Sequence, residues 1–372
     1  MQAVILVGGE GTRLRPLTST VPKPVVPLVD RPLIGYMLDW LRCHGVDEVI
    51  MSLGFLATGV RSVLGDGSDY GVALRFVEEP EPRGTAGALK YAEEFLDERF
   101  LMLNGDVLTD LDLTAQIAQH EATHATGTLA LVPVPDPSSY GLVRLRDDKA
   151  VEEFLEKPDP GTVLDTNLIS AGAYVLERSV LDLIESDRKV SIEREVWPRL
   201  VGDGLFGFDD QAAYWLDIGT PERYLQATFD ILERKVQTGP DMLAAGDLHA
   251  SYLDVDASVV CDGRVIPPAV VGSGTRISAG ANVGGLAALA AGVGVGVGSI
   301  VERCVVLDGA QIGARCVLRD CIVGPGVHIG DRTQVVDGAM LGEGVTVGAD
   351  NVIARGARIF PGVEVPDGGI AF

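Results

Sequence analysis

Residues 2–24 read QAVILVGGEGTRLRPLTSTVPKP, an apolar run that ends in glycines and passes into a segment of prolines and cations. The run over residues 2–7 has the aliphatic composition of a buried strand. Gly8, Gly9 and Gly11 let the main chain adopt positive φ and come close to a ligand. In α/β folds, ligands bind at the carboxyl ends of the strands. The stretch therefore predicts an α/β sheet and the position of a site at its edge.

Cations follow the glycines in the same loop. Arg13, Arg15 and Lys23 could neutralise several phosphate oxygens, and each charge-assisted hydrogen bond of this kind contributes about 1.5–3 kcal/mol when partly desolvated. The prolines among them stiffen the loop. The segment is not a Walker loop, because no Gly-Lys-Ser/Thr follows, and it lacks the third glycine of the dinucleotide fingerprint. It predicts phosphate binding, with a turn of solvated cations as the alternative.

Residues 1–235 alternate strand-like and helix-like segments. Short apolar runs such as EVIMSLG, LRFVEEP, FLMLNGD and TLALVPV end in turn or polar residues, and amphipathic stretches such as LIGYMLDWLRCHG lie between several of them. Strands that alternate with helices favour a mostly parallel sheet with both faces covered. We therefore predict an α/β fold for this part, with a Rossmann-like, mostly parallel sheet flanked by helices.

A six-residue period replaces the helical pattern from about residue 255. Its aliphatic residues form two series, which a phase slip near Ile312 separates. The series are Val259, Val265, Val271, Ile277, Val283, Leu289, Val295, Val301 and Leu307, and then Val317, Val323, Ile329, Val335, Leu341, Val347, Ile353, Ile359 and Val365. Such a period is typical of a parallel β-helix, whose coils stack their inward aliphatic residues. We predict a left-handed parallel β-helix over residues 255–372, after a linker over residues 236–254.

The charge balance limits the possible partners. The chain has 372 residues, with 53 acidic and 30 basic side chains and a formal net charge of −23. That charge repels a phosphate backbone and an anionic membrane surface, so we expect neither nucleic acid nor a membrane as a partner. The uncharged stretch 284–301 has the length of a membrane span, but its glycines and six-residue spacing favour β-helix coils. The five cysteines lack metal-ligand spacing and the N-terminus lacks a charged leader, which predicts reduced thiols in a cytoplasmic protein.

Two acidic residues follow apolar runs that we expect to be strands. Asp106 stands in LNGDVL and Asp217 in YWLDIGT. If the two carboxylates converge on one cleft, they could hold Mg²⁺, which takes few protein oxygens and shares its other positions with phosphates. A helix cap or an Asx turn is the alternative for each of them alone. Glu156 and Lys157 end another run, FLEKP, as a surface ion pair or as a clamp on sugar and phosphate.

Three histidines suggest other chemistries that we set aside. His120 and His124 fit the H-E-x-x-H pattern of zinc proteases, within HEATH. A catalytic zinc site needs a third protein ligand, and the sequence offers no obvious one. His328 is the only histidine within the hexapeptide repeats. It could serve as an acyltransferase base, but a lone histidine at a corner is more often exposed without a role.

Several motifs together resemble one known family. In chain order they are LVGGEGTRLRPLTSTVPKP, EPRGTAGAL, NGDVL, YGLV, FLEKP, SIEREVWP and YWLDIGTPERYLQA. In this order and spacing they are similar to those of the sugar nucleotidyltransferases, and most similar to mannose-1-phosphate guanylyltransferases that carry a C-terminal hexapeptide domain. The resemblance covers nearly the whole chain.

The resemblance implies a set of site residues. Arg13, Lys23, Asp106 and Asp217 are the implied catalytic residues, and the two aspartates the implied Mg²⁺ ligands. The implied nucleotide-binding residues are Leu6, Gly8, Gly9, Gly11, Thr12, Arg13, Gly84, Thr85, Asn104, Gly105 and Asp106. The implied sugar-phosphate pocket consists of Lys23, Gly141, Glu156, Lys157, Ser170, Ala171 and Gly172.

The resemblance also implies the reaction and the substrates. A sugar-1-phosphate attacks the α-phosphorus of a nucleoside triphosphate, and pyrophosphate leaves; the best match is GTP with mannose-1-phosphate. Ser170 stands where many relatives have asparagine, which shortens the reach toward the sugar. Glucose-1-phosphate with UTP or dTTP is therefore an alternative, and a non-catalytic regulatory subunit is another. The sequence does not decide which base and which sugar the protein takes, whether the product regulates it by feedback, or how many subunits assemble. We interpret the β-helix as an assembly or regulatory domain of a homo-oligomer.

Overall fold

The computed structural model describes residues 1–54, 57–159, 166–237 and 252–371. The chain divides into two compact units. Within the described part, the first unit consists of residues 1–9 and 36–215, and the second of residues 10–35, 216–237 and 252–371. The domain boundary predicted at residue 235 stays a prediction. Residues 238–251 of the predicted linker lie outside the described residues.

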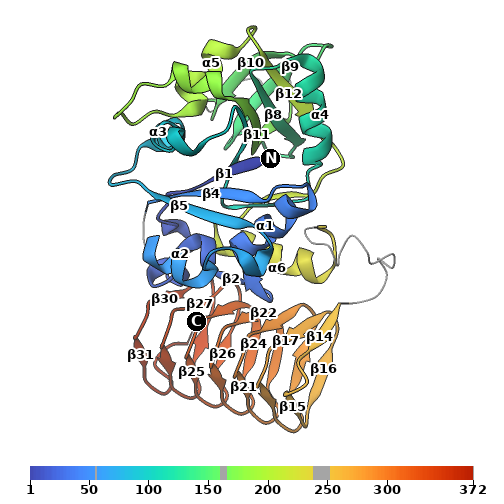
Figure 1. Cartoon of the computed structure of the whole chain (residues 1–372). Coiled ribbons are helices and arrows are strands. Elements are labelled where there is room, and N and C mark those ends of the chain that lie inside the picture. Colours follow the sequence, from blue (N-terminus) through green and yellow to red (C-terminus); the bar gives the residue numbers. More distant parts are fainter. Residues whose placement is uncertain (55–56, 160–165, 238–251, 372) are drawn as a thin grey trace. The chain divides into compact units, whose positions relative to one another are not determined.

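A mixed sheet forms the centre of the first unit (Figure 1). Its strand order is β10-β9-β11-β6-β1-β4-β5, and β8 pairs with both β11 and β12. The strands are β1 (Gln2–Val7), β4 (Glu48–Leu53), β5 (Ala73–Glu78), β6 (Arg99–Asn104), β8 (Gly127–Pro133), β9 (Gly141–Leu145), β10 (Val151–Glu156), β11 (Leu168–Glu177) and β12 (Leu205–Asp209). The longer helices are α1 (Leu33–Cys43), α2 (Ala57–Leu64), α3 (Gly84–Tyr91) and α4 (Leu113–Thr123), and the short helix α5 spans Trp197–Leu200.

Side chains on both faces of the sheet are buried, as expected for strands covered on two sides. Phe100 and Tyr174 belong to a core that also contains residues of α3 and α5. On the opposite face, Gln116 of α4 donates hydrogen bonds to the carbonyl oxygens of Thr128 and Ala173. Figure 1 shows α3 and α5 on one side of the sheet and α4 on the other.

The predicted α/β class is confirmed, and the structure adds the strand directions. β6, β1, β4 and β5 are parallel, with Ile5 of β1 opposite Met51 of β4 and Leu103 of β6. β11 runs antiparallel to β6, β8 and β9. The parallel part places the ends of β1 and β6 at one edge, while β11 brings a later segment of the chain back to that edge.

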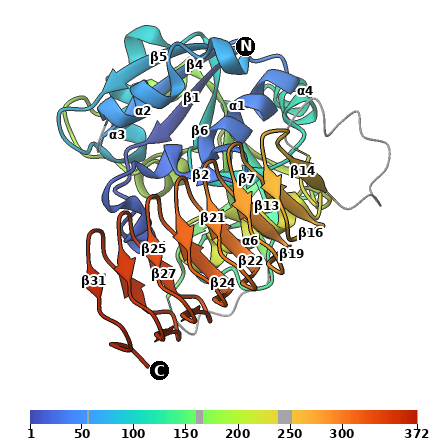
Figure 2. The same ribbon diagram turned by 90° about the horizontal axis from the view of Figure 1, so that it is seen from below.

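The C-terminal coils form a parallel β-helix, as predicted (Figure 2). One face contains β14 (Leu253–Val255), β17 (Ala269–Val271), β20 (Ala287–Leu289), β27 (Met340–Leu341) and β30 (Arg358–Ile359). A second contains β15 (Val260–Cys261), β18 (Arg276–Ile277), β21 (Gly294–Val295), β23 (Gln311–Ile312), β25 (His328–Ile329), β28 (Thr346–Val347) and β31 (Glu364–Val365). A third contains β16 (Arg264–Ile266), β19 (Asn282–Gly284), β26 (Gln334–Val335) and β29 (Val352–Ile353). β22 (Ile300–Val306) and β24 (Val317–Val323) turn the corner between the third face and the first.

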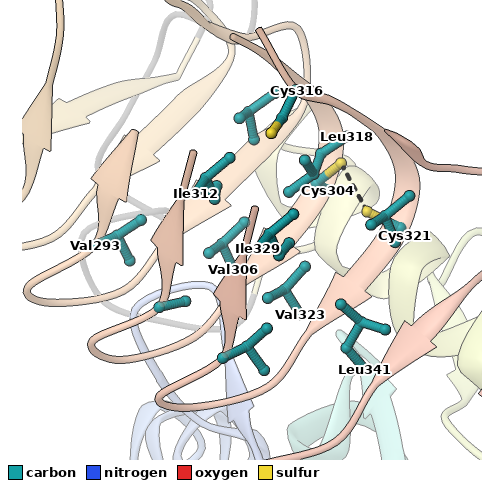
Figure 3. Packing of buried hydrophobic residues seen from close by; sticks show 14 of the residues in the cluster. Val293, Cys304, Val306, Ile312, Cys316, Leu318, Cys321, Val323, Ile329 and Leu341 are labelled. Atoms are coloured by element: carbon teal, nitrogen blue, oxygen red, sulfur yellow. Dashed lines mark hydrogen bonds between the residues drawn. The ribbon is translucent and has the colours of Figure 1, made fainter. Parts of the chain in front are cut away.

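The interior of the β-helix corrects one detail of the predicted period. Val306, Ile312 and Leu318 belong to the interior cluster, whereas the series had assigned Leu307 and Val317 (Figure 3). The reason lies in β22 and β24, which turn a corner of the β-helix. Within each of these strands, successive interior residues of the series are five positions apart instead of six, Val301 and Val306 in β22 and Leu318 and Val323 in β24. Two single-residue slips therefore replace the predicted slip near Ile312.

The interior also contains cysteines. Cys304 and Cys321 occupy matching positions of β22 and β24, with their sulfur atoms 3.5 Å apart (Figure 3). Burial raises the pKa of the Cys321 thiol. Cys316 is buried as well, while Cys43 and Cys261 are exposed, and all five are free thiols. The structure thus joins none of the five cysteines in a disulfide and buries three of them.

The second unit also contains helix α6 (Pro221–Leu232) and the segment 10–35, with the short strands β2 (Pro27–Leu28) and β3 (Arg31–Pro32). The side chain of Thr220 caps α6 by accepting a hydrogen bond from the backbone N–H of Arg223. α6 contacts β22 and β24, and the guanidinium of Arg303 lies over the ring of Phe229 at 4.6 Å. Among the described residues, no helix is long and apolar enough to cross a membrane.

Candidate active site

Gly141 and Glu156 face each other at the edge of the first unit's sheet. They are paired residues of β9 and β10, and a Cβ on Gly141 would come within 3.0 Å of Glu156 Oε2. Lys157 Nζ lies 3.3 Å from Glu156 Oε1, and its backbone N–H donates to the carbonyl oxygen of Tyr140. The Lys157 side chain is 62% exposed, whereas that of Glu156 is 17% exposed. The pair thus consists of an exposed cation, Lys157, and a mostly buried carboxylate, Glu156.

A bulge in β11 places the next predicted residues beside β6. The pairing of β11 with β8 shifts between Ser170 and Tyr174, and Gly172 adopts a φ of 78°. A Cβ on Gly172 would lie 2.8 Å from Asn104 Nδ2, so only glycine allows this close approach. The bulge therefore connects the predicted sugar-phosphate residues to Asn104, which ends β6.

Two aromatic rings link this bulge to Gly141. Trp215 Nε1 donates a hydrogen bond of 2.8 Å to the carbonyl oxygen of Ala171. The Trp215 ring meets the Tyr140 ring edge to face, with 5.3 Å between the centroids. Gly141, Glu156, Lys157, Ser170, Ala171 and Gly172 form a group that we call the sugar side.

Ser170 shares a hydrogen bond with a buried phenol. Its Oγ lies 3.0 Å from the hydroxyl oxygen of Tyr174. Burial, reinforced by the nearby negative charge of Glu193, raises the pKa of Tyr174 well above its usual value. Tyr174 therefore stays a neutral phenol at physiological pH, and it can hold the serine hydroxyl in one orientation.

The ends of β1 and β6 meet through a backbone hydrogen bond. The backbone N–H of Gly105 donates to the carbonyl oxygen of Leu6 at 3.0 Å. A Cβ on Gly105 would lie 2.3 Å from Val7 Cγ1, so this position requires glycine. Asp106 follows, just before strand β7 (Val107–Thr109). The contact brings Leu6, Asn104, Gly105 and Asp106 together near the start of the glycine-rich loop.

The predicted base loop is attached to a later segment of the chain. A Cβ on Gly84 would lie 2.6 Å from the carbonyl oxygen of Val190. Thr85 Oγ1 donates to Glu193 Oε2 at 2.9 Å and accepts from the backbone N–H of Ile192 at 2.8 Å. The Thr85 hydroxyl thus anchors α3 to the short π-helix η7 (Ile192–Val196). Contacts from Gly84 and Thr85 to a base stay a prediction.

Glu79 is a candidate that the sequence analysis missed. It follows β5, and its Oε1 lies 3.9 Å from the position that a Cβ on Gly8 would take. Its carboxylate accepts hydrogen bonds from Ser52 Oγ at 2.8 Å and from the backbone N–H of Arg83 at 3.0 Å. A carboxylate has about four acceptor sites, so it can accept further donors. The only signal for Glu79 in the sequence is weak, an acidic residue just after an apolar run.

The second unit contains the cationic loop, residues 10–27. Gly11 adopts a φ of 62° and precedes a single 3₁₀ turn over Thr12–Leu14. Thr18 Oγ1 donates to the carbonyl oxygen of Gly11 at 2.7 Å, and a Cβ on Gly11 would lie 3.1 Å from the Cβ of Lys23. A larger residue at position 11 would therefore meet both strain and a close contact. The structure brings Gly11, Thr12 and Lys23 together.

Arg13 and Arg15 have different surroundings. The Arg13 guanidinium packs against Gly219, where a Cβ would lie 2.7 Å from Nη2. Gly219 is two residues beyond Asp217, which ends strand β13 (Trp215–Asp217). Arg15 forms an exposed ion pair with Glu10 at 3.4 Å. The structure thus gives the two arginines different partners, and it places Arg13 beside the segment that contains Asp217.

The candidate residues fall into two groups, one in each unit. The first unit holds the sugar side, the base loop, the ends of β1 and β6, and Asp106. The second holds Gly11, Thr12, Arg13, Lys23 and Asp217. The chain passes between the two units at the Gly9–Glu10, Gly35–Tyr36 and Trp215–Leu216 peptide bonds. Within the described ranges, no cluster of three or more His, Cys, Asp or Glu side chains could hold a metal.

The histidines of the set-aside motifs have structural surroundings. His120 is fully buried, with Nδ1 2.8 Å from Thr128 Oγ1 and Nε2 3.1 Å from Glu177 Oε1. His124 ends α4 with a φ of 51°, outside the helix. His328 is exposed, and its Nδ1 lies 3.0 Å from the carbonyl oxygen of Gly326. Neither zinc binding nor acyl transfer gains support from these positions.

Both parts of the chain match known proteins. A model of nucleotidyl transferases matches residues 2–234, and a model of the GMPPB C-terminal domain matches residues 265–368. The chain is 36% identical over 378 residues to a mannose-1-phosphate guanylyltransferase of Mycobacterium tuberculosis, with 100% of this chain and 98% of that protein covered. It is 30% identical over 355 residues to a UTP–glucose-1-phosphate uridylyltransferase of Synechocystis, with 89% and 86% covered. The crystal structure of HddC from Yersinia pseudotuberculosis complexed with GMP-PN has a TM-score of 0.52 and 30% identity, and covers 61% of this chain and 97% of that one.

Proposed function

The chain belongs to the nucleotidyl transferase family, and from this premise we propose that it transfers the guanylyl group of GTP to mannose-1-phosphate. The products are GDP-mannose and pyrophosphate. The observation that carries the proposal is the close likeness, over the whole chain, to a relative named for this activity. The regulatory-subunit alternative is disfavoured because Arg13, Lys23, Asp106 and Asp217 are all present.

The proposed reaction is an in-line displacement at the α-phosphorus. A phosphate oxygen of the sugar-1-phosphate forms the new P–O bond, and the bond between the α- and β-phosphates breaks to release pyrophosphate. The attacking oxygen already carries negative charge, so no general base is required. The task of the protein is to bring two anions together, which positioned cations achieve by offsetting their repulsion. We assign this role to Arg13 at the β- and γ-phosphates and to Lys23 between the α-phosphate and the sugar phosphate.

A divalent metal fits the donor set of the chain. Two carboxylates, Asp106 and Asp217, are what Mg²⁺ takes from a protein when phosphates and water provide its other ligands. When bound, the metal would neutralise charge on the phosphates. The chain's own contribution is to supply the two carboxylates from separate segments, Asp106 from the turn between β6 and β7 and Asp217 from the end of β13.

Glu79 supports guanine among the possible bases. Guanine offers two neighbouring N–H donors on its pairing edge, and a carboxylate can accept from both. The carboxylate of Glu79 lies beside Gly8, the residue that the nucleotide is expected to approach. The chain is also similar to HddC, whose crystal structure is a complex with GMP-PN, and this similarity supports guanine as well. We therefore place the base between the ends of β1 and β5.

The sugar side supports a polyhydroxyl ligand with a phosphate. Glu156 offers a largely covered carboxylate for sugar hydroxyls, and Lys157 offers an exposed cation for the phosphate. Ser170, held by Tyr174, replaces the longer asparagine of many relatives. Glucose-1-phosphate is the second candidate, because the Synechocystis relative is named for it.

Pyrophosphate release tests the proposal directly. The purified chain with Mg²⁺ is incubated with GTP, UTP, dTTP, CTP or ATP, each crossed with mannose-1-phosphate and glucose-1-phosphate. We expect one dominant pair, GTP with mannose-1-phosphate. Turnover of glucose-1-phosphate with a pyrimidine nucleotide would keep the reaction class and overturn the substrate assignment. No release from any pair would favour the regulatory subunit.

We also propose that the chain assembles as a homo-oligomer through its β-helix. Stacked coils present flat faces, and several large apolar side chains of the terminal coils are exposed, among them Ile266, Phe360 and Val363. Sedimentation of the full chain at several concentrations would test this proposal, and a monomer throughout would contradict it.

A further inference from the structure

From β17 to β30, one column of outward-facing residues on the β-helix is apolar until its last position, whereas Asp254, which precedes the column in β14, is charged and exposed. In each strand of this column, the neighbouring residue points into the interior, as Val271 does beside Val270. The column, in strand order, is Val270, Ala288, Val305, Ile322, Met340 and Arg358. The first five are at most 5% exposed, although they face away from the interior. Arg358, the last residue of the column, is charged and exposed.

Arg358 reaches the cationic loop of the same unit. Its Nη1 donates hydrogen bonds to the carbonyl oxygens of Arg13 at 3.0 Å and of Arg15 at 3.1 Å. These carbonyls stand on both sides of Leu14, at the end of the 3₁₀ turn that follows Gly11. One nitrogen thus holds the turn at two points, across 345 and 343 residues of sequence.

The start of α6 completes the arrangement. The hydroxyl of Thr220 hydrogen-bonds the side chain of Glu222, and this contact, with the nearby charge of Arg358, holds the pKa of that carboxyl below its usual value. Gly219, which packs against the Arg13 guanidinium, is the residue just before Thr220. Arg13 is therefore held at its carbonyl by the β-helix and at its guanidinium by the segment that leads into α6.

We propose that Arg358 is a positioning residue, through which the last coils of the β-helix hold the Arg13 turn in the form that binds the nucleoside triphosphate. Arg358 does not touch substrate; it acts on the backbone of a residue that does. This inference rests on the proposed function and changes the interpretation of the β-helix, which becomes part of the nucleotide-binding apparatus as well as a surface for assembly.

The test compares three variants of the full-length chain. Arg358→Gln removes the charge and Arg358→Lys keeps it, while Arg276→Gln removes an exposed arginine of β18 as the matched control. Kinetic constants are measured for GTP and for mannose-1-phosphate, and the affinity for GTP alone is measured by calorimetry. For Arg358→Gln we expect KM for GTP to rise about tenfold, the effect of about one charge-assisted hydrogen bond. KM for mannose-1-phosphate should stay within about twofold, because the sugar side belongs to the first unit, whereas Arg358 and the Arg13 turn belong to the second.

Arg358→Lys should restore part of the affinity, and Arg276→Gln should match the wild type. The proposal would be overturned if Arg358→Gln left KM and Kd for GTP unchanged. It would also be overturned if KM rose equally for GTP and for mannose-1-phosphate, because a merely structural role predicts the same change for both substrates. If Arg358→Gln does not fold, Arg358→Met decides, since it removes both hydrogen bonds and repeats the apolar residue of the preceding position, Met340: a selective rise in KM for GTP supports the proposal, and wild-type values overturn it.

Failure of the proposed function is separable from failure of this inference. If the wild type releases no pyrophosphate from any pair, the proposed function fails, and GTP calorimetry still decides the role of Arg358. Weaker GTP binding in Arg358→Gln than in Arg276→Gln supports positioning. Equal binding in the two variants, or none in the wild type, overturns it.

Discussion

The two groups of candidate residues are held in place by different means. The sugar side is built on one sheet, and its contacts involve β9, β10, β11, Asn104 at the end of β6 and the Trp215 ring. The cationic loop contains little regular structure, and its shape depends on Gly11, Thr18 and contacts from α6 and β30. One group is a preformed surface, and the other is a backbone turn supported by residues distant in sequence.

This difference suggests a division of labour. A preformed surface with a fixed hydroxyl, such as Ser170 on Tyr174, is suited to discriminate among sugars. A turn that presents cations is suited to stabilise charge that develops in the transition state. We therefore expect changes in the metal and cation groups to lower turnover, and changes near the base or sugar to alter selectivity.

The carboxylates should show the largest effect. Asp106→Asn or Asp217→Asn removes one charge from the proposed metal ligands, and we expect kcat to fall about a thousandfold. The Asp69→Asn variant, at an exposed aspartate of the first unit, serves as the matched control. Pyrophosphate release measures the effect, and circular dichroism shows that the fold is kept. If Asp106→Asn folds and its kcat is within tenfold of the wild-type value, the proposed difference in role between the two groups is wrong.

Arg13 should follow, with a fall of about a hundredfold in kcat/KM for GTP in Arg13→Gln, because the guanidinium contacts the phosphates of GTP both when it binds and in the transition state. Arg15→Gln is the internal comparison, because Arg15 is paired with Glu10 and exposed. We expect less than a tenfold change for it. Equal losses in single-turnover assays would mean that both arginines contact phosphate, contrary to the different surroundings of the two side chains.

The fold was predictable where the signal is local and repeated. Both the alternation over residues 1–235 and the six-residue period are visible in short windows, so the sheet and the β-helix follow from them. The phase slips were misplaced because VVL at 305–307 and VL at 317–318 allow two frames, and only the three-dimensional corner selects one. The antiparallel direction of β11 leaves no local trace either.

The candidate site was predictable in its residue types but not in its contacts. Motif order pointed to Gly105 and Gly172, and the structure gives the reason for each glycine. Glu79 was missed because its relevance depends on Gly8, far away in sequence. Arg358 was missed for the same reason, since a cation in a repeat looks like solvated surface until its partners are known.

Base selectivity should change moderately in Glu79→Gln. Glutamine offers one acceptor and one donor in place of two acceptors, so it fits guanine less well and uracil or thymine better. We expect the ratio of kcat/KM for GTP to that for UTP to fall about tenfold. Competition assays with both nucleotides measure the ratio, and Glu78→Gln, at the neighbouring residue, whose side chain pairs with Arg61, is the control. An unchanged ratio would remove Glu79 from the base site.

The smallest effect concerns the pH dependence of the sheet that carries the sugar side. Burial lowers the pKa of His120, and the opposing contributions of Glu177 and Glu121 do not reverse this, while Arg99 adds to it. The unfolded chain, with a pKa near 6.5, therefore binds the proton first as the pH falls. The stability contributed by neutral His120 is fully present above about pH 6.5 and is lost as the pH falls toward the lower pKa of the folded state.

Urea unfolding at pH 7.5, 6.5 and 5.5 would reveal this loss, with a slope of at most about 1.4 kcal/mol per pH unit for one proton. The pKa of Glu177 is lowered too, because hydrogen bonds from Arg99 and His120 outweigh the effect of its burial, but its titration lies below this range. His120→Gln should flatten the slope, and His124→Gln, at the exposed end of α4, should not. Since His120 holds α4 against β8 and β11, a slope unchanged in His120→Gln would mean that the sheet behind the sugar side owes its pH dependence to other groups.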